Sequence, residues 1–224
     1  MVKLFLLRKP FHKEMAIDSL FRPLVNKCEL PKRAARFFAA SGISPNFLTL
    51  LSFFFAALAG LSFFFSSKYV ILLLLAGISI CLNAILDTLD GILAREIGNA
   101  NKKGDFLDHV FDRYSDVVIM CGIIFGGYIS CEIGMIAIIG VLLSSYMGTQ
   151  AQAVGLRRMY GGLLGRADRL LLLIVATFAT LCYPYPFPAS GPLSYSFLGW
   201  VMLLFAVLCN ITALQRFYYM WRGI

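Results

Sequence analysis

The sequence has few charged residues, few histidines and no paired cysteines. Charged residues make up 14% of its 224 residues, and two residues are histidine. The six cysteines occur singly and no CxxC pair is present, which excludes a recognisable zinc site or disulfide framework. Apolar residues make up 59%, and the mean hydropathy is +0.79. A soluble domain does not carry so much apolar surface, so we expect a polytopic membrane protein.

Six stretches are long and apolar enough to cross a bilayer as helices. A helix needs about 20 apolar residues to span roughly 30 Å of hydrocarbon, and it satisfies its own backbone hydrogen bonds there. The stretches are approximately 47–67, 69–94, 105–129, 133–155, 170–187 and 193–216. The sequence therefore predicts an all-α integral membrane protein with six transmembrane helices.

Lysine and arginine are divided unevenly between alternate connections. The region before residue 47 contains nine, and one side of the protein also has Arg95, Lys102, Lys103, Arg157, Arg158, Arg166, Arg169, Arg216 and Arg222. The other side has Lys68 alone. By the positive-inside rule both termini are expected in the cytoplasm, in a multi-pass protein of the plasma membrane. The net charge of +8 then indicates contact with anionic lipid, and no nucleic-acid partner is expected.

Residues 16–40 mix apolar and basic positions at roughly helical spacing. A helix lying in the headgroup plane fits this pattern, and Pro23 and Pro31 should divide it into two short pieces. A disordered basic leader is the alternative. We expect residues 1–43 to form a basic interfacial segment and residues 44–224 to form the six-helix membrane domain.

A cluster of aspartates is the most informative feature. Six of the eight aspartates fall within thirty residues that otherwise resemble membrane helices: Asp87, Asp90, Asp105, Asp108, Asp112 and Asp116. Asp87 and Asp90 are spaced i, i+3, and Asp108 and Asp112 are spaced i, i+4, so each pair shares one helix face. Because a short connection joins the two helices, we expect them to be antiparallel neighbours whose acidic faces meet.

Four carboxylates held together need a counter-charge. At about 6 Å and an effective dielectric constant of about 20, each pair repels by roughly 3 kcal/mol. Protonation is one remedy, but ligation by oxygen suits a hard divalent cation such as Mg²⁺, Mn²⁺ or Ca²⁺. Helix capping at the interface is the alternative role, and it suits Asp105, which opens a helix, better than the other aspartates.

Residues beside the acids supply further parts of a phosphate-handling site. Gly91 directly follows Asp90 and allows a ligand to approach the backbone. Arg95 lies one turn further on, where it can bind phosphate oxygens with two nitrogens. Gly104 breaks the chain before the third helix. A nucleotide diphosphate would fit these features.

Read as a string, the acidic region is Asp87-Thr-Leu-Asp90-Gly91-Ile-Leu-Ala94-Arg95, then eight residues, then Gly104-x₃-Asp108-x₃-Asp112. This string resembles the signature of the CDP-alcohol phosphotransferase family at every defining position. The expected six-helix topology and interfacial segment also look like that family, and residues 44–49, Ser-Pro-Asn-Phe-Leu-Thr, are similar to its segment before the first helix.

The resemblance implies a metal-dependent transferase that moves a phosphatidyl-type group from CDP-diacylglycerol or CDP-archaeol to a small alcohol and releases CMP. It implies a two-metal site for Mg²⁺ or Mn²⁺ held by Asp87, Asp90, Asp108 and Asp112, with Asp112 also serving as general base. It implies that the nucleotide and CDP-lipid are bound by Asn46, Thr49, Asp90, Gly91, Ala94, Arg95 and Gly104. The site would face the cytoplasm, and a homodimer is the family's usual assembly.

Four arginines are candidates for binding the acceptor: Arg157, Arg166, Arg169 and Arg216. Several guanidinium groups would favour an acceptor that carries its own phosphate, and ordinary loop charges are the alternative. Residues 165–169, Gly-Arg-Ala-Asp-Arg, look like the Arg-Ala-Glu-Arg stretch of the family's inositol-phosphate branch. Bacterial members of that branch have Lys-Ala-Arg after Ser-Tyr, whereas here residues 150–152 are Gln-Ala-Gln. We expect inositol phosphate, with glycerol 3-phosphate or serine as alternatives.

Two residues beside the motif are expected to have supporting roles. Asp116 continues the face of Asp112 one turn deeper, and we expect a structural role, with Arg113 as its candidate partner. His109 follows Asp108 but points about 100° away on a helix, which favours packing over ligation.

Two other function classes are compatible with intramembrane acids. A divalent-cation transporter also needs them, but the outer halves of the second and third predicted helices, 69–80 and 117–128, contain no carboxylate to continue a pathway. A catalytically inactive scaffold would be expected to have lost acids, and none of the motif's acids is missing. The transferase is therefore the leading hypothesis.

Overall fold

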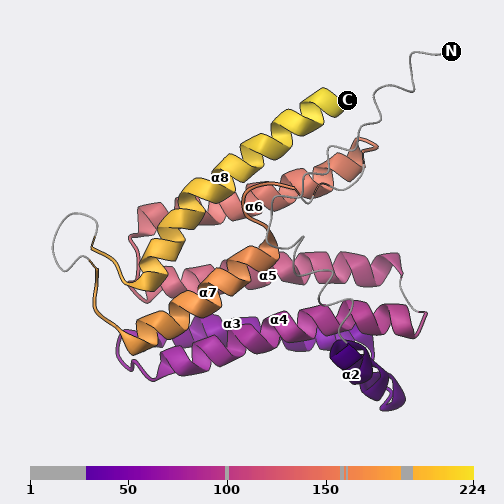
Figure 1. The fold of residues 1–224 in the computed structure, drawn as a ribbon, viewed down its shortest axis with the longest axis horizontal. Helices are drawn as coiled ribbons and strands as arrows, with labels where there is room; N and C mark the ends of the chain where they lie inside the picture. The colour runs from indigo at the N-terminus through magenta and orange to yellow at the C-terminus, as the bar shows by residue number, and fades with distance from the viewer. Residues whose placement is uncertain (1–28, 99–100, 157–158, 160, 188–193) are drawn as a thin grey trace.

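The structure, a computed structural model, describes residues 29–98, 101–156, 159, 161–187 and 194–224. Within them the chain forms seven helices: α2 (Glu29–Ala40), α3 (Pro45–Ser66), α4 (Leu72–Glu96), α5 (Lys102–Phe125), α6 (Cys131–Ala153), α7 (Arg166–Cys182) and α8 (Phe197–Gly223). Helices α3, α4 and α5 lie nearly along one direction, α7 and α8 are inclined to them, and consecutive helices run in opposite directions (Figure 1). The expected all-α fold is confirmed.

Four of these helices are long and apolar enough to span a membrane: α3, α4, α6 and α8. The chain is therefore an all-α membrane protein. Helix α5 carries the charged residues of the aspartate cluster in its first half, and α7 has 17 residues, about 26 Å of helix, which is shorter than a typical span. Both helices nevertheless lie in the same bundle as the four apolar ones.

Serine and asparagine residues define where most of the long helices begin. Ser44, Asn101, Ser130 and Ser196 each accept a hydrogen bond from the backbone N–H three residues later, at the starts of α3, α5, α6 and α8. Such caps satisfy a donor that has no partner inside the helix. In the sequence these residues separate the apolar stretches, which is why the predicted helix boundaries lie within a few residues of most of the observed ones.

Glycines bring α3 and α5 into close contact. A Cβ atom added to Gly122 would overlap the carbonyl oxygen of Gly60, and one added to Gly60 would lie 2.6 Å from the carbonyl oxygen of Val118. Small residues permit such backbone approach between membrane helices. Helix α3 also packs along α4, whereas α4 and α5 pack against each other far less than against α3. The sequence predicted that α4 and α5 pack directly against each other. In the structure these two acidic helices instead flank α3.

Helix α2 packs across the bundle at the end where α3 begins and α4 ends (Figure 1). Ala35 of α2 is fully buried in a cluster with Leu86, Leu89 and Leu93 of α4, while Leu30 and Phe37 are exposed. A helix is therefore present where the second piece was predicted, and its position in the headgroup plane stays a prediction. Pro31 does not interrupt the helix because it lies in the first turn, where no backbone donor is required. The first predicted piece, and most of the segment 1–43, lie outside the described residues.

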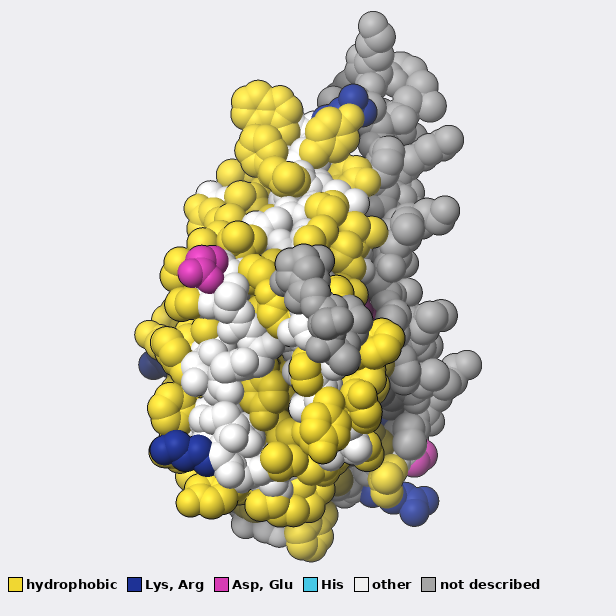
Figure 2. All heavy atoms as spheres, turned by 90° about the vertical axis from the view of Figure 1, so that its left-hand side faces the viewer, with side chains coloured by type: hydrophobic (Ala, Val, Ile, Leu, Met, Phe, Trp, Pro, Cys, Tyr) yellow, Lys and Arg dark blue, Asp and Glu magenta, His cyan; other side chains and the backbone are white. Residues whose placement is uncertain are grey.

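The two ends of the bundle differ in charge. Figure 2 views the end that carries the connections α3–α4, α5–α6 and α7–α8, and its surface is mainly hydrophobic with few charged side chains. Among the described residues of these connections and of the first turn of α6, Lys68 and Glu132 are the charged ones. The opposite end contains the end of α4 and the start of α5, which carry the aspartates. Residue 224 also lies at that end.

Candidate active site

The residues expected to bind the nucleotide line one pocket. A cavity of about 480 Å³ lies where α3 begins, α4 ends and α5 begins. Its wall includes all seven of the predicted residues: Asn46, Thr49, Asp90, Gly91, Ala94, Arg95 and Gly104. Asp108 also lines it. Because these residues come from three helices, only the fold can assemble them.

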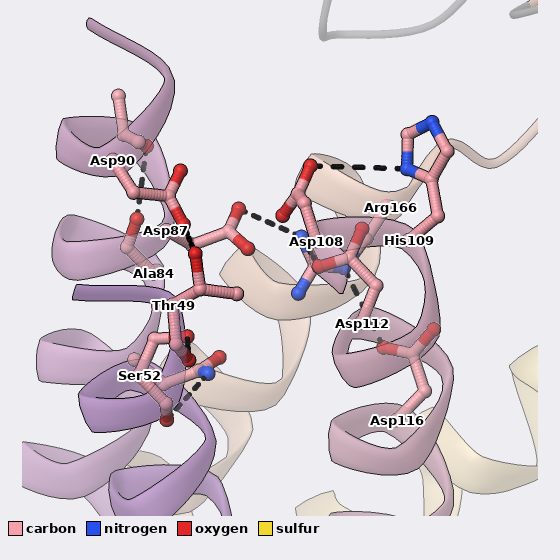
Figure 3. A network of polar contacts seen from close by, with 12 residues as sticks. Thr49, Ser52, Ala84, Asp87, Asp90, Asp108, His109, Asp112, Asp116 and Arg166 are labelled. Carbon is pink, nitrogen blue, oxygen red and sulfur yellow. Dashed lines mark hydrogen bonds and ion pairs between the residues drawn. The ribbon is translucent and has the colours of Figure 1, made fainter. Parts of the chain in front are cut away.

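The aspartates of α4 and α5 point toward one another next to this pocket (Figure 3). Asp90 is 5% exposed, and its Oδ2 accepts a hydrogen bond of 2.6 Å from the Thr49 hydroxyl. Asp112 is also buried, whereas Asp87 and Asp108 are half-buried. Asp90 and Asp108 face the pocket, and Asp87 and Asp112 lie beside it.

Arg166, the first residue of α7, inserts its guanidinium between Asp87 and Asp112 (Figure 3). Its Nη1 lies 2.7 Å from Oδ2 of Asp87 and 2.8 Å from Oδ1 of Asp112. The sequence placed Arg166 among four candidate acceptor-binding residues and gave no indication of this direct contact with the acids. The structure thus adds one positive charge to the centre of the cluster.

Asp116 forms a second, deeper ionic group with three arginines. Its Oδ2 lies 2.9 Å from Nη2 of Arg169 and 3.6 Å from Nη2 of Arg113, and its Oδ1 lies 3.9 Å from Nε of Arg166. The predicted partner, Arg113, is therefore present, and Arg169 is closer. A buried carboxylate with several cations is compensated, so Asp116 connects α5 to the start of α7.

His109 lies nearer the acids than its place in the sequence suggested. Its Nε2 is 3.3 Å from Oδ1 of Asp105, and its Nδ1 is 3.7 Å from Oδ2 of Asp108. One potential ligand atom from each of Asp108, His109 and Asp112 lies within 4.8 Å of the others. The packing role expected for His109 stays a prediction, and this geometry also makes its ring available to the acidic cluster.

The donor set fits a divalent cation of the Mg²⁺ or Mn²⁺ type. Asp87, Asp90, Asp108 and Asp112 supply four carboxylates, and Arg166 supplies one positive charge in contact with two of them, which leaves a net charge of −3. Hard oxygen donors of this kind are the ligands that Mg²⁺ and Mn²⁺ prefer. The residues present therefore fit the expected metal site, with Asp87 and Asp90 supplied by α4 and Asp108 and Asp112 by α5.

The other arginines expected at the acceptor site have different surroundings. Arg169 is buried and pairs with Asp116. Arg216 is buried in α8, donates from Nε to the carbonyl of Gly161 at 2.8 Å and from Nη1 to the carbonyl of Ser144. These bonds connect α8 with α6 and with the connection before α7. Arg157 lies outside the described residues, so within the described part of the chain Arg166 is the member of this set that contacts Asp87 and Asp112.

Sequence reasoning assigned five of the lining residues to neither the nucleotide nor the metal set, and two of them, Ser44 and Pro45, lie at the start of α3. Asn101, Lys102 and Asp105 join its wall from the start of α5. Asn101 caps α5, with its side chain accepting from the N–H of Gly104 at 2.9 Å, and this fixes Gly104 at the pocket. The signal available was the Asn-Lys-Lys-Gly string between the two halves of the motif, whose polar side chains had to lie near both.

Comparison with known proteins places these features in a family. The model of the CDP-alcohol phosphatidyltransferase family matches residues 42–212. An archaetidylinositol phosphate synthase from Pyrococcus horikoshii is 34% identical over 146 residues, which cover 65% of this chain and 75% of that protein.

Solved structures of the phosphatidylinositol phosphate synthase of Mycobacterium tuberculosis have a similar fold. The structure with CDP-DAG bound superimposes with a TM-score of 0.70 at 26% identity and covers 87% of this chain and 94% of that one. The complex of the same protein with manganese and citrate has a TM-score of 0.69 at 27% identity and covers 85% and 88%.

Proposed function

The chain belongs to the CDP-alcohol phosphatidyltransferase family, and from this we propose that it transfers a phosphatidyl-type group from a CDP-lipid to inositol phosphate and releases CMP. One observation carries the proposal: the pocket built by the seven nucleotide residues is lined by Asp90 and Asp108, and beside it Asp87 and Asp112 both contact Arg166. The donor pocket, the carboxylates and the Arg166 guanidinium, which can bind an anion, are therefore adjacent. A transfer between two phosphate-bearing substrates needs all three.

The nucleotide diphosphate of the donor would occupy the pocket. Gly91 leaves its backbone open to the ligand, and the Arg95 guanidinium lies near the position of a Cβ on that glycine. Arg95 is exposed and has five N–H donors for the diphosphate oxygens. Asn46 is exposed and Thr49 is buried at the start of α3, where they face the same space. These residues would hold the donor with its phosphates toward Asp90 and Asp108.

Asp112 is proposed as the general base. The acceptor hydroxyl loses its proton to the Asp112 carboxylate as its oxygen bonds to the lipid-bearing phosphorus, and the bond from that phosphorus to CMP breaks. Bound divalent cations would stabilise the charge that develops on the diphosphate and on the departing CMP. Asp87, Asp90, Asp108 and Asp112 are proposed to hold those cations, as the manganese complex of the related synthase supports.

The acceptor is proposed to be inositol phosphate because an archaetidylinositol phosphate synthase and a phosphatidylinositol phosphate synthase are among the related proteins. Arg166 is the proposed contact for the acceptor phosphate, since it adjoins Asp112. Arg169, Arg216 and Arg157 stay candidates for the same site. Family membership favours transfer over the cation-transport alternative.

Incubation of the purified protein with candidate substrates tests the proposal. CDP-diacylglycerol or CDP-archaeol is supplied with Mn²⁺ or Mg²⁺ and, separately, inositol 1-phosphate, inositol, glycerol 3-phosphate or serine. We expect CMP release with inositol 1-phosphate that exceeds release with unphosphorylated inositol. Release that is fastest with glycerol 3-phosphate or serine would reassign the acceptor, and release with none would reject the transferase.

We further propose that α3 to α8 form six spans with both termini and the active site at the cytoplasmic face of the plasma membrane, in a homodimer. The surplus of basic residues at the active-site end supports this orientation. Cys131 and Cys182 are exposed at the opposite end. A membrane-impermeant maleimide should therefore label them in intact cells, and Cys131→Ser with Cys182→Ser should abolish that label. Labelling only after lysis would reverse the orientation.

A further inference from the structure

A single nitrogen of Arg166 connects the two acidic helices. Nη1 lies 2.7 Å from Asp87 on α4 and 2.8 Å from Asp112 on α5. Arginine usually binds one carboxylate through two parallel hydrogen bonds. Here one nitrogen contacts two carboxylates, and the buried Nε has no hydrogen-bond partner among the described residues. The guanidinium therefore acts as a point charge between two acids and leaves part of its hydrogen-bonding capacity unused.

A divalent cation held by Asp87 and Asp112 would compete with Arg166 for the same two carboxylates. Arg166 contacts one oxygen of each, Oδ2 of Asp87 and Oδ1 of Asp112, and each carboxylate has a second oxygen. The guanidinium and the cation both carry positive charge and would repel each other at this short separation. Contact of Arg166 with Asp87 and Asp112 therefore opposes ligation of a cation by these carboxylates.

We propose that Arg166 is an exchangeable counter-ion of this site: it neutralises Asp87 and Asp112 before a divalent cation binds, and the cation releases it to bind the phosphate of the acceptor. The inference rests on the proposed function and deepens it, because it assigns Arg166 to two successive partners. Nη1, once released from Asp87 and Asp112, is then available to the acceptor's phosphate oxygens.

The backbone beneath Arg166 is held by other contacts, so its side chain can leave without unfolding the start of α7. The Asp168 carboxylate accepts a hydrogen bond from the N–H of Gly165 at 2.8 Å. Arg169, one turn after Gly165, is paired with Asp116 at 2.9 Å. The Arg166 side chain is 19% exposed, compared with 5% for Arg169. A change of side-chain rotamers is therefore sufficient for the exchange.

The exchange makes metal binding and phosphate binding favour each other. A cation that frees Arg166 raises the affinity for an anionic acceptor, and the acceptor must raise the affinity for the cation by the same factor. Couplings of this kind are typically between about 5-fold and 150-fold. An active-site arginine that never contacts the metal ligands would show coupling only through its charge.

Titration of the purified full-length protein with Mn²⁺ alone, followed by the spectroscopic signal of free Mn²⁺, tests the exchange. We expect Arg166→Gln to bind Mn²⁺ about five-fold or more tightly than the wild type, because a competing cation is removed. Lys103→Gln removes the same charge from the same end of the bundle, and Lys103 is exposed and forms no ion pair with Asp87 or Asp112 within the described part of the chain. It should change the affinity by less than about two-fold, since exposed charges without direct contact are screened. Equal effects of the two substitutions would overturn the exchange.

The wild-type protein offers a second test that needs no variant. Addition of inositol 1-phosphate should tighten Mn²⁺ binding by the wild type, after correction for Mn²⁺ bound by the compound itself, and should leave Arg166→Gln unchanged. No tightening in the wild type overturns the proposal. Absence of Mn²⁺ binding by every variant would reject the metal site of the proposed function together with the exchange, whereas measurable and equal affinities reject the exchange alone.

Discussion

The hydroxyl of Thr49 lies 2.6 Å from Oδ2 of Asp90 and 3.2 Å from the backbone carbonyl of Pro45. A hydroxyl has one proton to donate, and the shorter bond goes to the carboxylate. Thr49 on α3 therefore fixes the orientation of an aspartate on α4 that we propose as a metal ligand. Loss of a partner of this kind typically costs about 10-fold to 100-fold in metal affinity or activity.

Replacement of Thr49 by Val should weaken metal binding and leave the fold intact, because the shape of the side chain is kept and the hydrogen bond is lost. We expect the Mn²⁺ concentration for half-maximal CMP release to rise about ten-fold or more. Thr49→Ser retains the hydroxyl and should remain near the wild type. An unchanged metal requirement in Thr49→Val would show that Asp90 is oriented by other contacts.

Asp112→Asn should abolish CMP release while CDP-lipid binding remains measurable, because the amide cannot accept the hydroxyl proton but the pocket residues are untouched. Glu132→Gln is the matched control, since it is the same acid-to-amide change at the opposite end of the bundle. Activity of the control should stay within about two-fold of the wild type. Full turnover by Asp112→Asn would remove it from the role of base.

Gly91→Ala should raise the KM for the CDP-lipid without lowering thermal stability. A Cβ at Gly91 would lie 3.7 Å and 3.9 Å from the Arg95 guanidinium nitrogens, which is ordinary van der Waals contact, so the protein alone tolerates it. The methyl group would instead occupy space in the pocket. Measurement of KM and melting temperature separates the two effects. A lower melting temperature with an unchanged KM would contradict the proposed close approach of the ligand.

Gly122→Ala should have the opposite effect and destabilise the fold. Its methyl group would overlap the Gly60 carbonyl and force α3 and α5 apart, at a cost of about 1–3 kcal/mol or more. Gly161→Ala is the control, because a Cβ there meets no atom within 4 Å. Thermal unfolding in detergent should show a lower midpoint for Gly122→Ala only. Equal midpoints would mean that the two helices can separate at little cost.

Arg216→Ala should destabilise the protein more than Arg222→Ala. The buried Arg216 donates to the carbonyls of Gly161 and Ser144, and hydrogen bonds from charged groups contribute about 1.5–3 kcal/mol. Arg222 is exposed and lies over the ring of Tyr218. Comparison of melting temperatures checks the difference. A raised KM for the phosphorylated acceptor at unchanged stability would instead support the acceptor role predicted for Arg216.

Much of the candidate site could be predicted because the motif is local in the sequence. The spacing of Asp87 with Asp90, and of Asp108 with Asp112, fixes which side chains share a helix face whatever the tertiary structure. Apolar length identified four of the helices as membrane spans, and the positions of serine and asparagine caps explain most of their boundaries. The end of α8 was predicted too early, at residue 216, because its last turn contains Arg222 and aromatic residues instead of aliphatic ones.

The tertiary structure decided how the acids are separated and neutralised. Arg166 lies 79 residues from Asp87 in the sequence, and nothing in the spacing of either residue indicates a contact of 2.7 Å. That contact depends on the packing of α7 against α4 and on the glycines that hold α5 against α3, so that α4 and α5 face each other across the guanidinium. The sequence by itself determined a membrane protein with a paired-aspartate motif, because composition and helical periodicity are local properties. The position of the Arg166 guanidinium between those aspartates depends on helix packing, which is a long-range property.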